Sequence, residues 1–448
     1  MIVAIPMWAS EWRAKLVRAQ AELGWVILGQ LAAFLGGFAV IKVLTNLLEP
    51  AAYGRLALGI TIAGLVQMFV YGPIDQTVLR FVSVHRERGS LGIFIAALKR
   101  VHRLAASLVV PATILSAGAV YFSANGEWGW LVLSSCLFGI ASGFYGAFVS
   151  LHNAFRQRRV VTLHQGIDVW LRMCFSVIAI TVFSRTGSAA LIGYFLAASV
   201  MAISIVYFAL KLPALSEHWS VPIQSEEAIC RTMRELVEFG KPFLYFAIFG
   251  LVSAYADRWI VFGMLGEEAV GRYAVIYQLA NAPILLAVGI MNQFIVPLIF
   301  DRAGAIATDG QSRGSTQLLY QIVRVFGVMI LLLVGATYLF SETVVRFVTA
   351  SEFVVYHHLL WIVVLGVGTF QLAQLLVLKG LSHNMTAGYV VPKMVQAVAL
   401  VLLLVLLTNA IGIVGVAWAL FGSSLVYLFA VLWVNRKIVV MVKVTTEC

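Results

Sequence analysis

The sequence predicts an all-α membrane protein that crosses the bilayer many times. Of its 448 residues, 61% are hydrophobic and 11% are charged, and the mean hydropathy is +0.95. A soluble globule of this length needs far more polar surface than such a composition supplies. The apolar residues fall in stretches of about 20, the length that crosses a bilayer as a helix, and not in the alternating ten-residue segments of a membrane barrel.

Twelve apolar stretches follow one another along the chain. An N-terminal segment (1–22) carries tryptophans beside basic residues, a pattern typical of an amphipathic helix on the membrane surface. The stretch that follows is too long for a signal peptide and lacks a small-residue cleavage site, so it is predicted to be the first span. The predicted spans are 23–44, 56–82, 104–122, 128–151, 166–183, 189–210, 242–264, 270–300, 318–340, 354–378, 391–408 and 413–434.

The basic residues are divided unevenly between the two sides of this predicted bundle. An even number of spans places both termini on one side; 23 of the 31 Lys and Arg residues lie on that side, Lys393 among them, and four lie in the opposite loops. Because basic loops remain in the cytoplasm, we predict cytoplasmic termini. The same distribution accounts for the net charge of +11 without nucleic acid. The four cysteines are too scattered to indicate a disulfide framework or a metal site.

The chain repeats itself after the sixth span. When residues 236–293 are moved back by 217 positions, they lie on the first two spans without a gap. The matches are Gly271-Arg272 with Gly54-Arg55, Gly289 with Gly72, and Asn292-Gln293 with Asp75-Gln76. Two parallel copies of six helices imply a pseudo-two-fold axis along the membrane normal. We therefore predict two lobes of six helices each, in the order N-terminus (1–22), N-lobe (23–210), cytoplasmic linker (211–240), C-lobe (241–434) and cytoplasmic tail (435–448).

Three stretches resemble a known family of transporters. They are EFGKPF…DRWIV…LGEEAVGRYAV at the start of the second half, LTNLLEPAAYGRLAL after the first span, and IGIVGVAWA at the start of the last span. In their order and spacing they are similar to polysaccharide-transport proteins of the multidrug/oligosaccharidyl-lipid/polysaccharide exporter superfamily, and most of all to the O-antigen flippases (Wzx type). The resemblance implies a V-shaped pair of lobes around a central cavity lined by spans one, two, seven and eight.

The activity that this resemblance implies is the flipping of a lipid-linked oligosaccharide by alternating access. An undecaprenyl-pyrophosphate-linked glycan would pass from the cytoplasmic to the periplasmic leaflet of the bacterial inner membrane, for O-antigen, lipopolysaccharide or exopolysaccharide synthesis. The resemblance implies no enzymatic step and no cofactor, although a coupling ion, H⁺ or Na⁺, is left open. Membrane lipids and the polymerase and chain-length proteins of the same pathway are the implied partners; nucleic acid is not.

Two basic residues are the first candidates for binding the pyrophosphate. Lys42 and Arg258 lie at matched depth in the outer third of the first and seventh spans, one position apart in the repeat. A basic side chain at the bilayer centre costs about 3 kcal/mol, so it usually faces a cavity or a partner. We predict that both bind phosphate, Arg258 through a bidentate fork. Because each lies about one helical turn from the end of its span, snorkelling to the membrane surface is the alternative.

Other polar residues inside the spans are further candidates. Asp257 either pairs with a neighbouring helix or couples transport to H⁺ or Na⁺. Arg172 follows Asp168 by four residues, so it either forms a local helical ion pair or serves the cavity. The remaining candidates either line the cavity or serve as packing bonds and head-group contacts. They are Asp75, Gln76, Asn292, Gln293, Arg80 and Arg324.

Helix-breaking residues occur in the second and eighth spans. Gly72, Pro73, Pro283 and Pro297 interrupt these helices, because proline removes a backbone hydrogen bond. They are either hinges of a rocking motion or static kinks. No metal site is predicted.

Three other functions are alternatives to this flippase reading. A cation-coupled multidrug exporter needs an acidic cavity, whereas the charges inside these spans lean slightly basic. A lipid II flippase differs only in the chemistry of its substrate. An integral-membrane glycan polymerase or ligase needs a sizeable outer loop with catalytic residues, and the outer loops predicted here are short.

Overall fold

The computed structural model describes residues 7–123, 125–213, 215–216, 225–292, 309–381 and 387–446, and every regular element among them is a helix. The first half contains α1 (Met7–Leu47), α2 (Pro50–Val66), η1 (Gln67–Tyr71), α3 (Gly72–Glu87), α4 (Leu91–Ser123), α5 (Gly126–Ala154), α6 (Arg158–Val182) and α7 (Gly187–Leu210). The second half contains α9 (Glu226–Ile290), α11 (Asp309–Val348), η3 (Ser351–Leu359), α12 (Leu360–Leu381), η4 (Ala387–Tyr389), α13 (Val390–Ile411) and α14 (Ile413–Thr446).

The described residues contain eleven helical stretches that are long and apolar enough to cross a membrane. One of them, Ala247–Ile290, contains two crossings, because the chain reverses at Gly266. Gly266 has φ 85°, a conformation that glycine adopts without strain. The Tyr273 hydroxyl donates a hydrogen bond of 2.6 Å to Asp257, although 16 residues of straight helix would separate these positions by about 24 Å. The chain therefore makes the twelve crossings that the sequence predicts.

The second crossing is one long helical unit that contains a local irregularity. Residues 50–87 run through α2, the π-helical turn η1 and α3, with Pro73 in the first turn of α3. Proline has no N–H, so the carbonyl of Phe69, four residues earlier, loses its usual partner and the widened turn η1 accommodates the loss. The predicted interruption at Gly72-Pro73 is therefore present as a local change of helix type.

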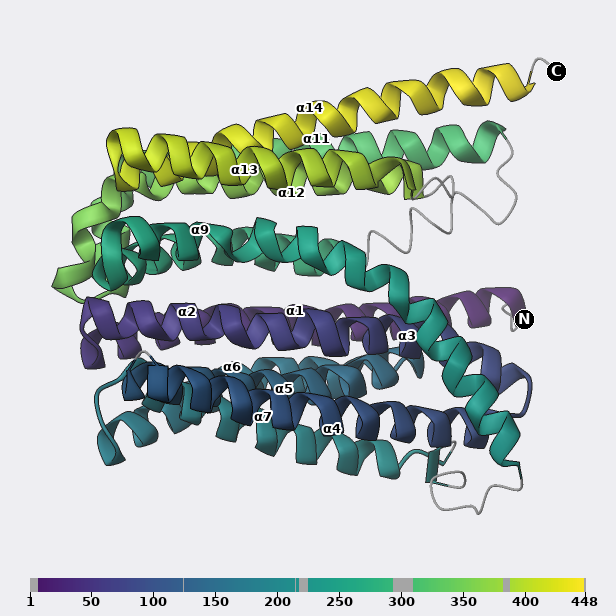
Figure 1. The fold of residues 1–448 in the computed structure, drawn as a ribbon. Helices are drawn as coiled ribbons and strands as arrows, with labels where there is room; N and C mark the ends of the chain where they lie inside the picture. The colour runs from purple at the N-terminus through teal and green to yellow at the C-terminus, as the bar shows by residue number, and fades with distance from the viewer. Residues whose placement is uncertain are drawn as a thin grey trace, which may run out of the picture.

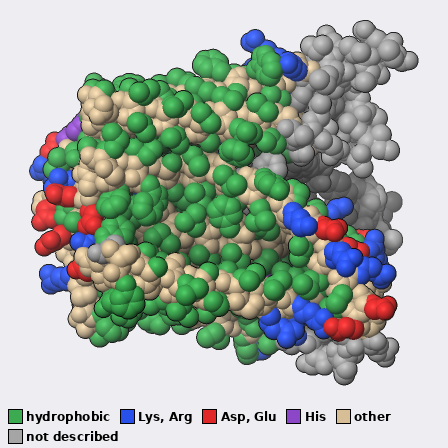
Figure 2. Space-filling view, viewed as in Figure 1, with side chains coloured by type: hydrophobic (Ala, Val, Ile, Leu, Met, Phe, Trp, Pro, Cys, Tyr) green, Lys and Arg blue, Asp and Glu red, His purple; other side chains and the backbone are tan. Residues whose placement is uncertain are grey.

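The helices gather into two groups (Figure 1). Helices α1 to α7 pack together as the N-lobe, and α11 to α14 pack with the two arms of α9 as the C-lobe. Both ends of the chain lie at the same end of the bundle. Figure 2 shows a broad hydrophobic belt with charged side chains gathered at the two ends, as a membrane-spanning bundle requires.

The first turns of α9 attach the connector between the lobes to the N-lobe. Arg100 on α4 makes two hydrogen bonds to the carboxylate of Glu226, at 2.5 and 2.7 Å, and holds the pKa of that carboxyl below its ordinary value. Further along, the rings of Phe81 and Phe239 meet edge to face at 5.3 Å. The last part of the predicted linker is thus a helix that continues directly into the seventh crossing.

The two lobes meet most closely where the repeated Gly-Arg pairs lie. A Cβ atom on Gly54 would be 2.1 Å from the Glu267 carbonyl oxygen, and one on Gly271 would be 1.8 Å from the Pro50 carbonyl oxygen. The backbones of α2 and α9 therefore touch directly, as small residues allow in membrane helices. Beside this crossing the Arg55 guanidinium pairs with Glu267 at 2.6 Å and also with Glu127.

Replacing Gly271 with alanine tests this crossing. The added Cβ would force α2 and α9 apart, and overpacking of this kind costs about 1–3 kcal/mol or more. We expect the midpoint of thermal unfolding in detergent to fall by several degrees. Gly263→Ala, on the same helix, adds a Cβ that meets no atom within 4 Å and should leave the midpoint unchanged or higher. Equal midpoints for the two variants would contradict the crossing.

Candidate functional site

A cavity of about 510 Å³ lies between the two lobes. Its wall is formed by α1, α2, α5, α6, α7 and both arms of α9. Among the residues that the structure describes, the lining includes two arginines and no carboxylate. The polar side chains of the lining are Gln30, Tyr53, Thr61, Arg172, Tyr194, Tyr255, Arg258, Tyr277, Gln278 and Asn281.

Arg258 lies deep in this cavity wall. It is only 8% exposed, and its Nη1 donates to the Ala254 carbonyl at 2.9 Å and to Asp257 Oδ1 at 3.2 Å. The guanidinium carbon lies 4.6 Å from the centre of the Tyr277 ring, a cation–π contact. Nε and Nη2 donate to no described residue, so part of the guanidinium fork remains available to a ligand in the cavity.

Asp257 contacts Arg258 from outside the cavity lining and fixes its position. Its carboxylate is 3% exposed and accepts hydrogen bonds from the Tyr273 hydroxyl at 2.6 Å and from the Arg258 backbone N–H at 2.8 Å. Asp257 does not belong to the cavity lining. The pairing that the sequence indicates is present, because Tyr273 comes from the following arm of α9. Coupling of transport to H⁺ or Na⁺ through Asp257 remains a prediction.

Arg172 reaches the same cavity from the N-lobe. Its Nε and Nη2 donate to the two carboxylate oxygens of Asp168, at 3.1 and 2.5 Å, which is the pair that the four-residue spacing indicates. The guanidinium carbon also lies 5.0 Å from the centre of the Phe138 ring. Because Nη1 has no hydrogen-bond partner among the described residues, Arg172 pairs locally and still presents donors to the cavity.

Tyrosines and amides make up most of the remaining polar wall. The Tyr53 hydroxyl donates to Gln278 Oε1 at 2.9 Å across the lobe interface. On the same interface Trp259 Nε1 donates to Thr61 Oγ1 at 2.8 Å. The sequence analysis missed the tyrosines of this wall; the spacing of Tyr273 and Tyr277, four residues apart on one helical face, was a signal that could have found two of the tyrosines around Arg258.

Lys42 does not share the cavity with Arg258, which corrects the expectation of a matched pair. Lys42 is exposed, and its ammonium group donates to the Thr349 carbonyl at 3.1 Å. The repeat aligns Arg258 with Ile41, and Ile41 does line the cavity. One position along a helix turns a side chain by about 100°, so the offset of a single residue directs Lys42 away from the lining.

The other candidates also lie outside the lining of this cavity. Asp75 is half-buried, and its Oδ1 has no hydrogen-bond partner among the described residues. Gln293 and Pro297 lie outside the described residues. The candidates with exposed side chains are Gln76, Arg80, Asn292 and Arg324.

Two further sequence expectations concern hinges and metals. Pro283 lies inside the second arm of α9 without interrupting it, whereas the helix changes type just before Gly72-Pro73. A hinge role for Gly72, Pro73, Pro283 and Pro297 remains a prediction. Within the described part of the chain, no three His, Cys, Asp or Glu side chains gather in a way that could hold a metal ion.

Comparison with known proteins identifies the family. Residues 20–302 match the model of a family described as polysaccharide biosynthesis protein.

The chain belongs to this family. The match covers more than half of the sequence and both sides of the cavity, including α1, α2, α6 and the two arms of α9. No curated protein sequence matches the chain significantly.

Solved structures share the fold. The lipid II flippase MurJ in an inward closed conformation matches with a TM-score of 0.67 at 13% identity, covering 92% of this chain and 87% of MurJ. A point mutant of the Vibrio cholerae MATE transporter VcmN gives 0.63 at 13%, covering 93% and 95%. A transporter of the MOP superfamily from Pyrococcus furiosus gives 0.62 at 12%, also covering 93% and 95%. At sequence identities of 12–13%, the likeness to these structures shows that the chain shares their fold.

Tyr273→Phe tests how Arg258 is held. The variant leaves Asp257 Oδ2 buried without its donor, which costs about 1–3 kcal/mol. We expect a lower free energy of unfolding in micelles. Tyr255→Phe is the matched control, because the Tyr255 hydroxyl makes no hydrogen bond to a described residue although the ring lines the same cavity. If the two variants lost equal stability, the Asp257–Tyr273 bond would not be what secures the site.

Proposed function

We propose that the chain flips a polyprenyl-pyrophosphate-linked oligosaccharide from the cytoplasmic to the periplasmic leaflet of a bacterial inner membrane, by alternating access, during synthesis of a surface polysaccharide such as O-antigen or exopolysaccharide. The observation that carries this proposal is the inter-lobe cavity, whose described lining contains two arginines with donors that no described residue uses and no carboxylate. Membership of the polysaccharide biosynthesis family supports it.

The arginines suit the pyrophosphate of such a substrate. Each guanidinium has N–H groups that no described residue uses, and planar forks of this kind bind phosphate oxygens in pairs. The carboxylates of Asp168 and Asp257 compensate the charges from behind, which lowers the cost of keeping two cations inside the membrane. An entering anion therefore finds donors already oriented towards it.

The rest of the wall suits the glycan. Sugar hydroxyls both donate and accept hydrogen bonds, and so do the tyrosine hydroxyls and amides of this lining. Polar groups in a membrane cavity stay solvated until a ligand replaces their water. The cavity can accordingly hold an oligosaccharide head group in a layer that would otherwise exclude it.

The lining disfavours a cation-coupled multidrug exporter, because a cationic drug would meet two arginines. MurJ flips lipid II, so a lipid II substrate remains the alternative within the same chemistry. Coupling to H⁺ or Na⁺ through Asp257 would require its contacts with Tyr273 and Arg258 to break. The polymerase and chain-length proteins of the pathway are the partners we expect.

A reconstituted flipping assay tests the proposal. Vesicles would contain the purified protein and a fluorescent citronellyl-pyrophosphoryl trisaccharide, and dithionite would report the label that reaches the outer leaflet. We expect Arg258→Gln and Arg172→Gln each to slow flipping about tenfold or more, since a hydrogen bond to a charged group is lost. Arg258→Lys keeps the charge and should lose less.

Arg324→Gln is the matched control. It removes an arginine from a membrane helix, but this side chain is exposed and does not line the cavity, so flipping should continue at the unaltered rate. Unaltered rates in Arg258→Gln, Arg172→Gln and the double variant would refute the proposed phosphate site. Export of ethidium in place of the pyrophosphate lipid would favour the multidrug reading.

A further inference from the structure

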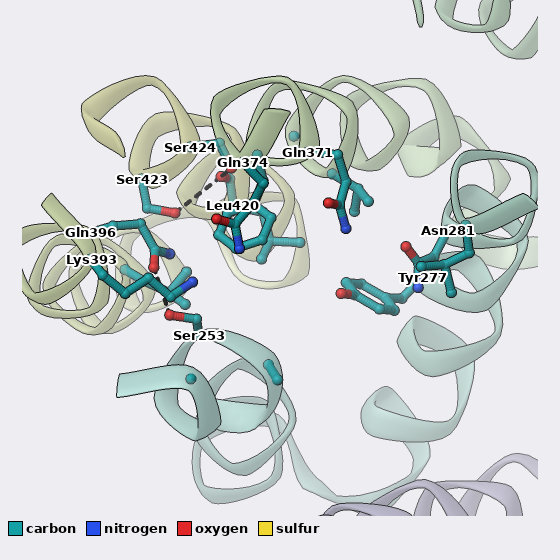
Figure 3. A pocket seen from close by; sticks show the side chains of 17 residues that line it. Ser253, Tyr277, Asn281, Gln371, Gln374, Lys393, Gln396, Leu420, Ser423 and Ser424 are labelled. Atoms are coloured by element: carbon teal, nitrogen blue, oxygen red, sulfur yellow. Dashed lines mark hydrogen bonds between the residues drawn. The ribbon is translucent and has the colours of Figure 1, made fainter. Parts of the chain in front are cut away.

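A second cavity, of about 330 Å³, lies inside the C-lobe (Figure 3). It is lined by both arms of α9 and by α12, α13 and α14. Of the described part of the chain, one ammonium group and no carboxylate line it. Its polar side chains are Ser253, Tyr277, Asn281, Gln371, Gln374, Lys393, Gln396, Ser423 and Ser424. Amides and hydroxyls around a single cation suit a polyhydroxylated ligand that carries a negative charge.

Lys393 is the cation of this cavity; the sequence predicts it at the cytoplasmic end of the span 391–408. In the structure it lies in the first turn of α13 and is half-buried. Its Nζ lies 4.2 Å from the centre of the Phe370 ring and 5.3 Å from that of Tyr427. Among the described residues Lys393 has no carboxylate partner. A half-buried ammonium supported only by aromatic faces attracts an anion.

The amides of the cavity retain hydrogen-bonding capacity. Tyr427 donates to Gln374 Oε1 at 2.8 Å and Ser253 donates to Gln396 Oε1 at 2.6 Å, so one end of each amide is satisfied. The other ends of these two amides have no hydrogen-bond partner among the described residues, and neither has Gln371. Figure 3 shows Gln371 and Gln374 on one side of the cavity and Lys393 and Gln396 on another.

The spacing of these residues explains why they converge. Gln371 and Gln374 are three residues apart on α12, and Lys393 and Gln396 are three apart on α13. Residues three apart lie on one face of a helix, so each helix presents two polar groups to the same space.

This cavity adjoins the one between the lobes. Tyr277, Asn281 and Leu285, all on the second arm of α9, line both. The other face of this shared wall is where Arg258 stacks on Tyr277. A substrate whose phosphate is bound at Arg258 therefore has a polar space beside it for the attached sugars.

We propose that the C-lobe cavity is a glycan subsite that selects an acidic sugar. Lys393 binds the carboxylate of a uronic-acid residue, and Gln371, Gln374 and Gln396 bind its hydroxyls. This inference rests on the proposed function, since it assigns the sugar portion of the same lipid-linked substrate to a second space. It adds a substrate class: oligosaccharides with a negatively charged sugar near the pyrophosphate.

Ligand binding to the full-length protein in lipid nanodiscs tests the subsite. Methyl glucuronide, methyl glucoside and citronellyl pyrophosphate would be titrated separately and followed by saturation-transfer NMR. We expect Lys393→Met to weaken glucuronide binding about tenfold or more while glucoside and citronellyl pyrophosphate binding are unchanged. Gln371→Leu, at a side chain that bonds no described residue, should weaken both sugars, and Lys393→Arg should retain glucuronide binding.

Lys437→Met is the matched control, because Lys437 also stacks on an aromatic ring, Trp433, but is exposed and does not line the cavity. It should bind all three probes as the unaltered protein does. Glucuronide binding that is unchanged in Lys393→Met, or no binding of glucuronide to the unaltered protein, overturns the subsite. Citronellyl pyrophosphate binding that ignores Arg258 and Arg172 overturns the proposed function, while a Lys393-dependent glucuronide site would still stand.

Discussion

The direct contact between the backbones of α2 and α9 at Gly54 and Gly271 is the constraint on which the rest of this structure depends. No side chain separates the helices there, so the lobes are joined at one end of the bundle. Further along the same helices, side chains from both contribute to the wall of the cavity between the lobes. The Gly-Arg pair recurs in both halves because each half contributes one helix to the crossing. Arg55 joins the two helices at this crossing through an ion pair with Glu267. Because this pair is partly exposed to solvent, breaking it costs little free energy.

The ion pairs deeper in the membrane each lie within one lobe, unlike the Arg55–Glu267 pair, which joins the two lobes. Arg172 is neutralised by Asp168 on its own helix, and Arg258 by Asp257 on its own helix, so each pair lies within one lobe. If the lobes rock about the crossing, as the proposed function requires, both pairs stay intact and no desolvation penalty arises from a broken buried ion pair. Asp168 and Asp257 do not line the inter-lobe cavity, so the guanidinium groups are the members of these two ion pairs that face it.

Most of the fold could be predicted from the sequence, because the bilayer demands apolar helices of fixed length and the chain repeats its pattern. The site was harder. Arg258 and Arg172 were found as charges inside spans, but Lys42 was assigned to the cavity from a repeat offset by one residue, which on a helix is a turn of about 100°. Lys393 was missed because it lies in the first turn of its span, where composition alone cannot separate a loop charge from a lining charge. Only the packing of α12 and α14 around it reveals the cavity.

The cations of the two cavities also occupy different depths. Lys393 is three residues from the start of α13, about 5 Å along the helix, whereas Arg172 is 14 residues from the start of α6, about 21 Å along. Both helices are the fifth crossing of their lobes and start at the end of the bundle where the chain termini lie. Arg258 stands eight residues before the turn at Gly266, near the opposite end. Positive groups therefore follow one another across the thickness of the bundle. On the proposed function, an anionic head group that leaves one of these cations would have another within the next turns of helix, which lowers the cost of its path through the membrane.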